Sequence, residues 1–228
     1  MKYYILNPVL DSQIAEIKQK ISLSMNGIVS EQMIQGGINY KKNFGVSIPR
    51  LKEIASSYKP QHDLAQRLWD LKIRETMILA TLLQPTDTFT PKIAKQWADD
   101  FNQIEIVEQC CMNIFCKLSW ATEISCNWIN SDKLWIQITA FRLAARVFEN
   151  LSNEEIKSIT LRAVELSNTD EFHLYKSIAV CLSRFCRKDR LTAIYVKNLT
   201  NFGADSVSVG QQFIKYELTQ ELLFLEIL

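Results

Sequence analysis

The sequence has few of the residues that interrupt helices. Only six glycines and five prolines occur among its 228 residues. So few breakers favour helices joined by short loops over many short strands. The sequence also lacks the alternating polar and apolar pattern of half-buried strands and any Gly-, Ser- or Pro-rich linker. We therefore expect an all-α protein that forms a single domain over residues 1–228.

The sequence also lacks a charge excess and a long apolar run. Its formal net charge is +1. Proteins that bind DNA usually carry a visible basic excess, so any DNA contact here has to come from local clusters. The first residues are interrupted by Asn7, Pro8 and Asp11 and do not resemble a signal peptide. Since no apolar run is long enough to span a membrane, we expect a cytoplasmic protein without a membrane partner.

Metal-binding patterns are missing as well. No CxxC pair occurs, and the only two histidines, His62 and His173, lie far in sequence from the cysteines. A zinc site is therefore disfavoured. The six cysteines lie inside apolar helical patterns, which indicates small buried thiols in a reducing compartment. They are Cys110, Cys111, Cys116, Cys126, Cys181 and Cys186.

What the sequence does contain is helical periodicity. Apolar residues at helical spacing follow Asp11, and Ser47 with Pro49 and Thr90 with Pro91 predict two helix starts. Helix pairs are then expected at 61–71 with 73–84, 91–101 with 103–117, 120–129 with 132–149, 152–167 with 170–186, and 188–202 with 206–226. The second helices are richer in apolar residues and recur roughly every 30 to 38 residues, as in helical hairpin repeats. Such hairpins hide their apolar faces by stacking, which predicts a solenoid with a concave inner surface.

Three segments carry a family resemblance: "NYKKNFGVSIPRLKEIA" (39–55), "LWDLKIRETMILATLL" (68–83) and "FHLYKSIAVCLSRFCRKDRLTAIYVKN" (172–198). Together they resemble the AlkD-like DNA alkylation repair family over residues about 35 to 220. The resemblance implies a superhelical solenoid of antiparallel HEAT-like helical repeats. It also implies double-stranded DNA, alkylated or not, as the partner, and no metal or organic cofactor. The enzymes of that family are DNA glycosylases that excise N3- and N7-alkylated purines.

The family's catalytic segment matches "QIEIVEQ" (103–109) only in part. The family's tryptophan position falls on Ile104 and its acid position on Glu108. A second cleft tryptophan is replaced by Val180, and an arginine pair by Gln137 and Ile138. Release of a cationic base needs a carboxylate near the developing oxocarbenium charge, and aromatic faces help by cation–π attraction. Glu108 is therefore the candidate catalytic residue, with a side chain one methylene longer than that of the family's aspartate.

A structural interpretation of the same helix competes with this one. If it begins near Gln103, a buried stripe includes Ile104, Val107, Cys111, Ile114 and Leu118. Glu105 and Glu108 then lie off the stripe in the first two turns, where negative charge suits the helix dipole. The five tryptophans have two interpretations as well: as core between repeats or, less often, as base-stacking platforms.

Two basic clusters are candidates for phosphate contact. Residues 37–74 hold eight Lys or Arg against three acids, and residues 184–197 hold five against one. The alternative for the second cluster is a solvated helix end. Tyr40, in the loop before "FGV", is the aromatic residue most suited to reach a cleft. The DNA-binding candidates are Tyr40, Lys41, Lys42, Gln137, Arg184, Arg187, Lys188 and Arg190.

Two functions follow from these observations. The first is a DNA-binding protein of alkylation repair that acts as a weak or altered glycosylase through Glu108. The second is a non-catalytic repeat protein that kept the scaffold and binds structured DNA or a protein partner. The changes at Ile104, Gln137, Ile138 and Val180 favour the second function, and the carboxylate at Glu108 favours the first.

Overall fold

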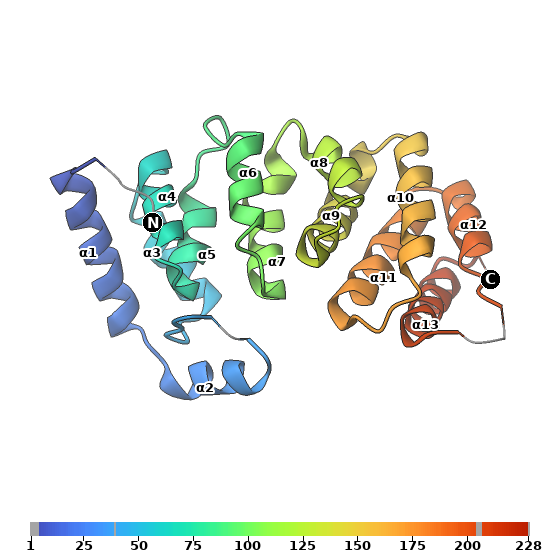
Figure 1. Ribbon diagram of the computed structural model, residues 1–228, viewed down its shortest axis with the longest axis horizontal. Helices are drawn as coiled ribbons and strands as arrows, with labels where there is room; N and C mark the ends of the chain where they lie inside the picture. Colours follow the sequence, from blue (N-terminus) through green and yellow to red (C-terminus); the bar gives the residue numbers. More distant parts are fainter. Residues whose placement is uncertain (1–4, 39, 204–206, 228) are drawn as a thin grey trace. The chain divides into compact units, whose positions relative to one another are not determined.

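The computed structural model describes residues 5–38, 40–203 and 207–227, and these residues form helices and no strand (Figure 1). The prediction of an all-α protein is confirmed. The helices are α1 (Pro8–Leu23), α2 (Gly27–Gln35), α3 (Ile48–Ser56), α4 (His62–Asp70), α5 (Arg74–Leu83), α6 (Pro91–Ala98), α7 (Ile104–Asn113), η1 (Phe115–Lys117), α8 (Ala121–Trp128), α9 (Leu134–Val147), η2 (Phe148–Asn150), α10 (Asn153–Leu166), α11 (Phe172–Cys186), α12 (Arg190–Leu199) and α13 (Val209–Phe224).

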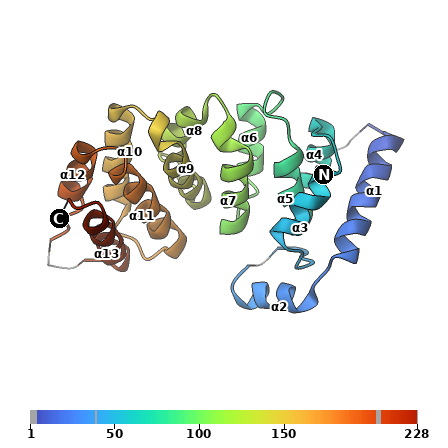
Figure 2. The same ribbon diagram turned by 180° about the vertical axis from the view of Figure 1, so that it is seen from behind.

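The chain divides into two compact units, residues 1–114 and 115–228. In the first unit α5 packs against α3, α4 and α7. In the second unit α9 packs against α8 and α11, and α11 packs against α12 and α13 (Figure 2). Within each unit the second helix of one pair thus contacts the second helix of the next, as stacked hairpins require. The single domain over residues 1–228 stays a prediction.

Most predicted helix starts agree with the structure. Ser47 caps α3 and Thr90 caps α6, each with proline in the first turn. The first helix starts earlier than expected, because the side chain of Asn7 accepts a hydrogen bond from the Leu10 amide and Pro8 opens the helix. Asp11 therefore lies in the first turn instead of before it. Asn39 and Ser206, which belong to two of the predicted segments, lie outside the described residues.

The tryptophans of the first unit belong to its core. Trp69 and Trp97 are fully buried and stack with their ring centroids 4.0 Å apart and an angle of 2° between the rings. The Trp69 indole N–H donates to Asp100 at 2.8 Å and that of Trp97 to Gln66 at 3.2 Å, so neither buried donor lacks an acceptor. For these two residues the core interpretation holds.

A buried ionic cluster connects α5 with α7 and with the loop before α3. Arg74 is 1% exposed and Glu75 is fully buried. The guanidinium of Arg74 donates to the Val46 carbonyl and Glu75, both at 2.9 Å, and to both oxygens of Glu105 at 2.8 and 2.6 Å. Burial by itself lowers the pKa of Arg74, but the hydrogen bonds and charges of Glu105 and Glu75 raise it above its ordinary value. Arg74 therefore stays charged inside the protein.

Glu75 forms hydrogen bonds with the backbone of the loop before α3. Its carboxylate accepts hydrogen bonds from the Phe44 amide at 3.1 Å and the Val46 amide at 3.3 Å. The Arg74 amide in turn donates to the Lys42 carbonyl at 3.0 Å. These bonds explain why "NFGV" and "RE" belong to the same sequence pattern although they are about 30 residues apart. The side chains of the second segment form hydrogen bonds with the buried backbone groups of the first.

The loop also carries α2, and Gly45 makes this contact possible. Gly45 has a φ of +68°, and a Cβ atom there would lie 2.2 Å from the Asn26 carbonyl oxygen. The Asn26 amide donates to the Phe44 carbonyl at 2.8 Å, and the Ser30 hydroxyl donates to the Asn43 carbonyl at 2.9 Å. Helix α2 was not expected from the sequence, because none of its residues is buried and it therefore shows no amphipathic stripe.

Four of the six cysteines are buried, and Cys116 and Cys126 are half-buried. Burial raises the pKa of Cys126 to about 11 and that of Cys186 to about 12, which leaves these thiols protonated and unreactive. Among the described residues, no group of three or more His, Cys, Asp or Glu side chains is placed to hold a metal ion. In the same ranges no helix is long and apolar enough to cross a membrane.

We predict that Arg74→Met lowers the free energy of unfolding by about 3–5 kcal/mol, because it leaves the buried Glu75 carboxylate without its cation. Arg50→Met is the matched control. Its exposed pair with Glu53, at 2.8 Å, is worth less than about 1 kcal/mol. Urea unfolding followed by circular dichroism measures both, and equal losses for the two variants would contradict the role given to Arg74.

We also predict that Gly45→Ala destabilises the protein by more than about 1–2 kcal/mol, the cost of the left-handed backbone alone, since the new methyl group also clashes with Asn26. Gly27→Ala should be neutral or stabilising by up to about 1 kcal/mol, because a Cβ at Gly27 meets nothing within 4 Å and alanine favours the helix. Thermal unfolding of the two variants compares them, and a neutral Gly45→Ala would refute the close approach.

Candidate nucleic-acid interface

The two carboxylates of α7 have different surroundings. Both oxygens of Glu105 accept hydrogen bonds from Arg74, and its side chain is 17% exposed. Glu105 is thus a structural residue in the first turn of α7, as the structural interpretation expects, with Arg74 as a partner that the sequence did not reveal. Glu108 lies one turn further along α7 and is half-buried. It is the carboxylate that remains for the candidate catalytic role.

The buried face of α7 follows the predicted stripe. Val107, Cys111 and Ile114 are fully buried, and Ile104 is half-buried. The stripe also includes Ile106 and Cys110, which the prediction left out. Ile104, at the position of the family's tryptophan, therefore contributes an aliphatic side chain on the same helix as Glu108.

The other substituted positions lie in the second unit. Ile138 is fully buried in α9, and the side-chain amide of Gln137 donates to the Ser131 carbonyl at 2.6 Å. Gln137 is only 9% exposed, and its amide group is bonded to the loop before α9. Val180 on α11 is 38% exposed and presents a small aliphatic surface. None of these three side chains offers an aromatic face or a guanidinium.

Two aromatic residues of the second unit, Trp135 and Tyr175, differ in their exposure. Trp135 is half-buried, with its ring centroid 5.4 Å from that of His173. Burial, followed by the charges of Arg142 and Lys176, lowers the pKa of His173, so its ring is neutral at pH 7. Tyr175 is 8% exposed and lies against Phe213, with 5.1 Å between the ring centroids. Trp135 is thus the more accessible of the two.

Tyr40 lies against the buried ionic cluster of the first unit. Its hydroxyl oxygen is buried, and burial followed by the charge of Glu105 raises the pKa of the phenol. The phenol is therefore neutral at physiological pH. The polar end of Tyr40 faces the cluster, and only the remainder of the half-buried side chain is open to a ligand. Its role in DNA binding stays a prediction.

Half of the first basic cluster is engaged within the protein. Arg74 is buried, Arg50 pairs with Glu53, Arg67 pairs with Asp11 and Lys72 pairs with Asp100. Four lysines are exposed and make no ion pair with any described residue: Lys41, Lys42, Lys52 and Lys59. Lys41 and Lys42 lie together in the loop beside α2. The available charge of this cluster is therefore concentrated in fewer side chains than the sequence count implies.

The second cluster divides in the same way. Arg187 donates to both oxygens of Glu221 at 2.6 and 2.8 Å, and Lys188 donates to the Leu151 carbonyl. Asp189 caps α12 through the Thr192 amide at 2.8 Å. Arg184 and Arg190 are exposed and have no ion pair within the described part of the chain. A phosphate can reach both of them without breaking an ion pair, and Lys197, the fifth cation of the cluster, is half-buried.

Sequence reasoning could not separate engaged from available cations. Each of four cations has a partner that lies between 31 and 56 positions away along the chain: Arg67, Arg74, Arg187 and Lys188. No local spacing rule reports such pairs. The one usable signal was the occurrence of "RE" with "FGV", which reflects the ionic cluster described above.

Comparisons with known proteins agree with the architecture. A sequence profile of the family described as DNA alkylation repair enzyme matches residues 18–194. One solved structure, described as from a new family of proteins related to the HEAT-like repeat DNA glycosylases with affinity for branched DNA structures, superposes with a TM-score of 0.75. It is 13% identical, over 90% of this chain and 94% of the other. A search of curated proteins finds no match. This chain therefore has the HEAT-like repeat fold and belongs to the DNA alkylation repair family.

Proposed function

We propose that this chain is a DNA-binding member of the family that recognises branched DNA and does not excise bases. The observation that carries the proposal is the set of side chains at the family's pocket positions. Ile104, Ile138 and Val180 are aliphatic, and the amide of Gln137 is bonded to the backbone. A cationic base would find no aromatic cradle at these positions, and cation–π contacts of that kind contribute up to about 2 kcal/mol when desolvated.

Binding to DNA rests on family membership and on the available cations. Lys41 and Lys42 in the first unit, and Arg184 and Arg190 in the second, are exposed without an ion pair among the described residues. Phosphate contacts of such side chains supply most of the sequence-independent affinity for DNA. The preference for branched DNA is supported by the solved structure of the same fold, whose description names that affinity.

A second function, weak excision of alkylated purines, is favoured by one specific observation. Glu108 provides a carboxylate at the family's acid position, on the second turn of α7. Its side chain is one methylene longer than aspartate, and a misplacement of about 1 Å costs roughly a hundredfold in rate. Without aromatic support the expected activity is lower still.

We predict that the purified protein releases no N7-methylguanine or N3-methyladenine from methylated DNA above the uncatalysed background. Release is followed by chromatography, with Glu108→Gln as the matched variant. If the wild type releases base and Glu108→Gln does not, the second function replaces the first. If both release base equally, Glu108 has no part in the reaction.

We predict that Arg184→Gln combined with Arg190→Gln weakens DNA binding and lowers the slope of log K against log salt concentration. The slope should fall by up to about 1.8, because each phosphate that a cation neutralises contributes about 0.9 to it. Arg187→Gln is the control, since Arg187 is already bonded to Glu221 and should change the slope little. Fluorescence anisotropy at several salt concentrations measures the slopes. Equal slopes in wild type and double variant would show that Arg184 and Arg190 contact solvent and not phosphate.

A further inference from the structure

Helix α2 is held to the protein by polar bonds and leaves two of its apolar side chains, Ile28 and Ile34, exposed. None of its residues is buried. Asn26 and Ser30 bind the backbone of Phe44 and Asn43. Meanwhile Met25, just before the helix, is 62% exposed, and Ile28 and Ile34 are 73% and 57% exposed. Of these side chains, Met25 and Ile34 line one hollow, and contiguous exposed apolar surface of this kind can mark a binding site.

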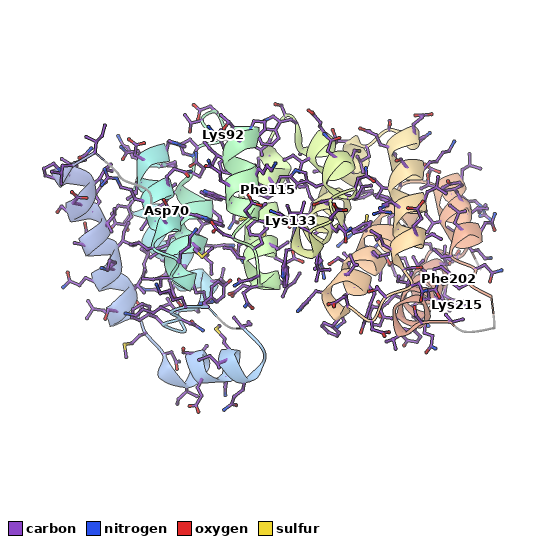
Figure 3. All side chains as sticks on the ribbon, viewed as in Figure 1. Asp70, Lys92, Phe115, Lys133, Phe202 and Lys215 are labelled. Atoms are coloured by element: carbon purple, nitrogen blue, oxygen red, sulfur yellow. The ribbon has the colours of Figure 1, made fainter. Side chains whose placement is uncertain are left out.

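The surroundings of α2 are visible in all three views. Helix α2 lies beyond the end of α1, and no other helix of the first unit overlaps it in either ribbon view (Figure 1, Figure 2). With all side chains drawn, some of those of α2 extend from its ribbon into open space and others lie toward the loop (Figure 3). Helix α2 is therefore accessible to a ligand on the surface of the first unit.

A hollow of about 320 Å³ lies between α2 and this loop, and we name it the α2 hollow. Its volume is at the lower end of the range for small-molecule sites, about 300–1,000 Å³. Its apolar lining comes from Met25, Ile34 and Phe44. Its polar lining comes from Ser30, Glu31, Lys42 and Asn43, with Gly27 completing the wall. A flat heterocycle fits these conditions, with carbon surface on its faces and polar atoms at its edge.

The charges around the α2 hollow favour a nucleic acid. The Lys42 ammonium lies 4.6 Å from the centre of the Phe44 ring, and exposed Lys41 precedes it. Lys18 and Lys42 line a second hollow of about 220 Å³ that shares Phe44. Cations beside an aromatic and aliphatic surface are the combination that single-stranded nucleic acids require, the first for phosphates and the second for base faces.

Other occupants fit less well. Helices that lie on membranes carry Lys and Arg on their polar face, whereas α2 has no cation and one acid, Glu31. Glu31 suits a nucleobase, because a carboxylate accepts hydrogen bonds from the exocyclic amino group of cytosine. Bases within an intact duplex are stacked and cannot enter, but a branch point offers unpaired bases at a low cost of unstacking.

We propose that the α2 hollow receives an unpaired nucleobase at a branch point in DNA. This inference rests on the proposed function and adds to it the site and the part of the DNA that is read. The exposed cations hold the backbone of any DNA, while the α2 hollow distinguishes branched DNA from duplex. Removing its apolar surface should therefore affect branched DNA alone.

The test compares Met25→Ser combined with Ile34→Ser with the wild type. Both side chains are more than half exposed, so the fold does not depend on them. The probes are a three-way junction with one unpaired 2-aminopurine at the branch and a duplex of the same length. Removing the stacking of one base is expected to weaken junction binding about tenfold, within the range of about 1–3 kcal/mol for one base. Duplex binding should not change, and 2-aminopurine emission should respond to the wild type only.

The control is Leu191→Ser, which removes an apolar side chain that is 80% exposed in the second unit. It should bind both probes as the wild type does. Ile34→Trp gives an independent measurement: an added aromatic face should tighten junction binding and leave duplex binding unchanged. Circular dichroism and thermal unfolding of each variant establish that it is folded.

The outcomes separate the two proposals. If the wild type prefers the junction and the double serine variant keeps that preference, the α2 hollow is not the site, and the proposed function stands. If the wild type binds neither probe, both proposals are wrong. A concentration-dependent dimer that the double variant abolishes, seen by sedimentation, would assign the surface to a second copy of the chain and overturn the assignment to DNA.

Discussion

The interaction on which the first unit depends is the buried guanidinium of Arg74. It lies among Glu75, Glu105 and the Val46 carbonyl, all within 2.9 Å of its nitrogens. A buried ion pair is weak evidence for stability by itself, because the cost of desolvation can exceed the attraction. Its effect here is to specify one arrangement: α5, α7 and the loop before α3 have to meet at this point for the buried guanidinium and the Val46 carbonyl to be hydrogen-bonded. The position of α2 follows, since it is bonded to the same loop.

This constraint distinguishes the two neighbouring glutamates of α7. Glu105 completes the set of acceptors around Arg74, so its substitution would leave a buried cation short of a partner. Glu108, one turn later, is not part of that cluster. Two carboxylates three residues apart thus have separate roles that their spacing does not reveal. The scaffold is retained as in the family, while the positions that would cradle a cationic base carry aliphatic side chains or a backbone-bonded amide.

A net charge of +1 does not exclude DNA binding, because ion pairs within the fold use up acids together with cations and leave other cations exposed. Arg67, Arg74 and Arg187 each pair with an acid far away in the sequence. Other cations are exposed, and two of them, Lys41 and Lys42, lie in the loop beside α2. Affinity for phosphate and contact with bases can therefore be supplied by adjacent parts of one surface of the first unit.

The sequence by itself determined the helical architecture. The spacing of apolar residues and the local caps at Ser47 and Thr90 act within one or two turns of helix, so they can be recognised without a structure. It also indicated the family, because segments such as "FGV" and "RE" occur in order. Only the tertiary structure decided that Glu105 is bound to Arg74, that Arg187 and Lys188 are engaged, and that α2 exists with its apolar residues exposed. Each of these depends on contacts between residues far apart in the chain, or on an absence of burial, and neither leaves a periodic pattern in the sequence.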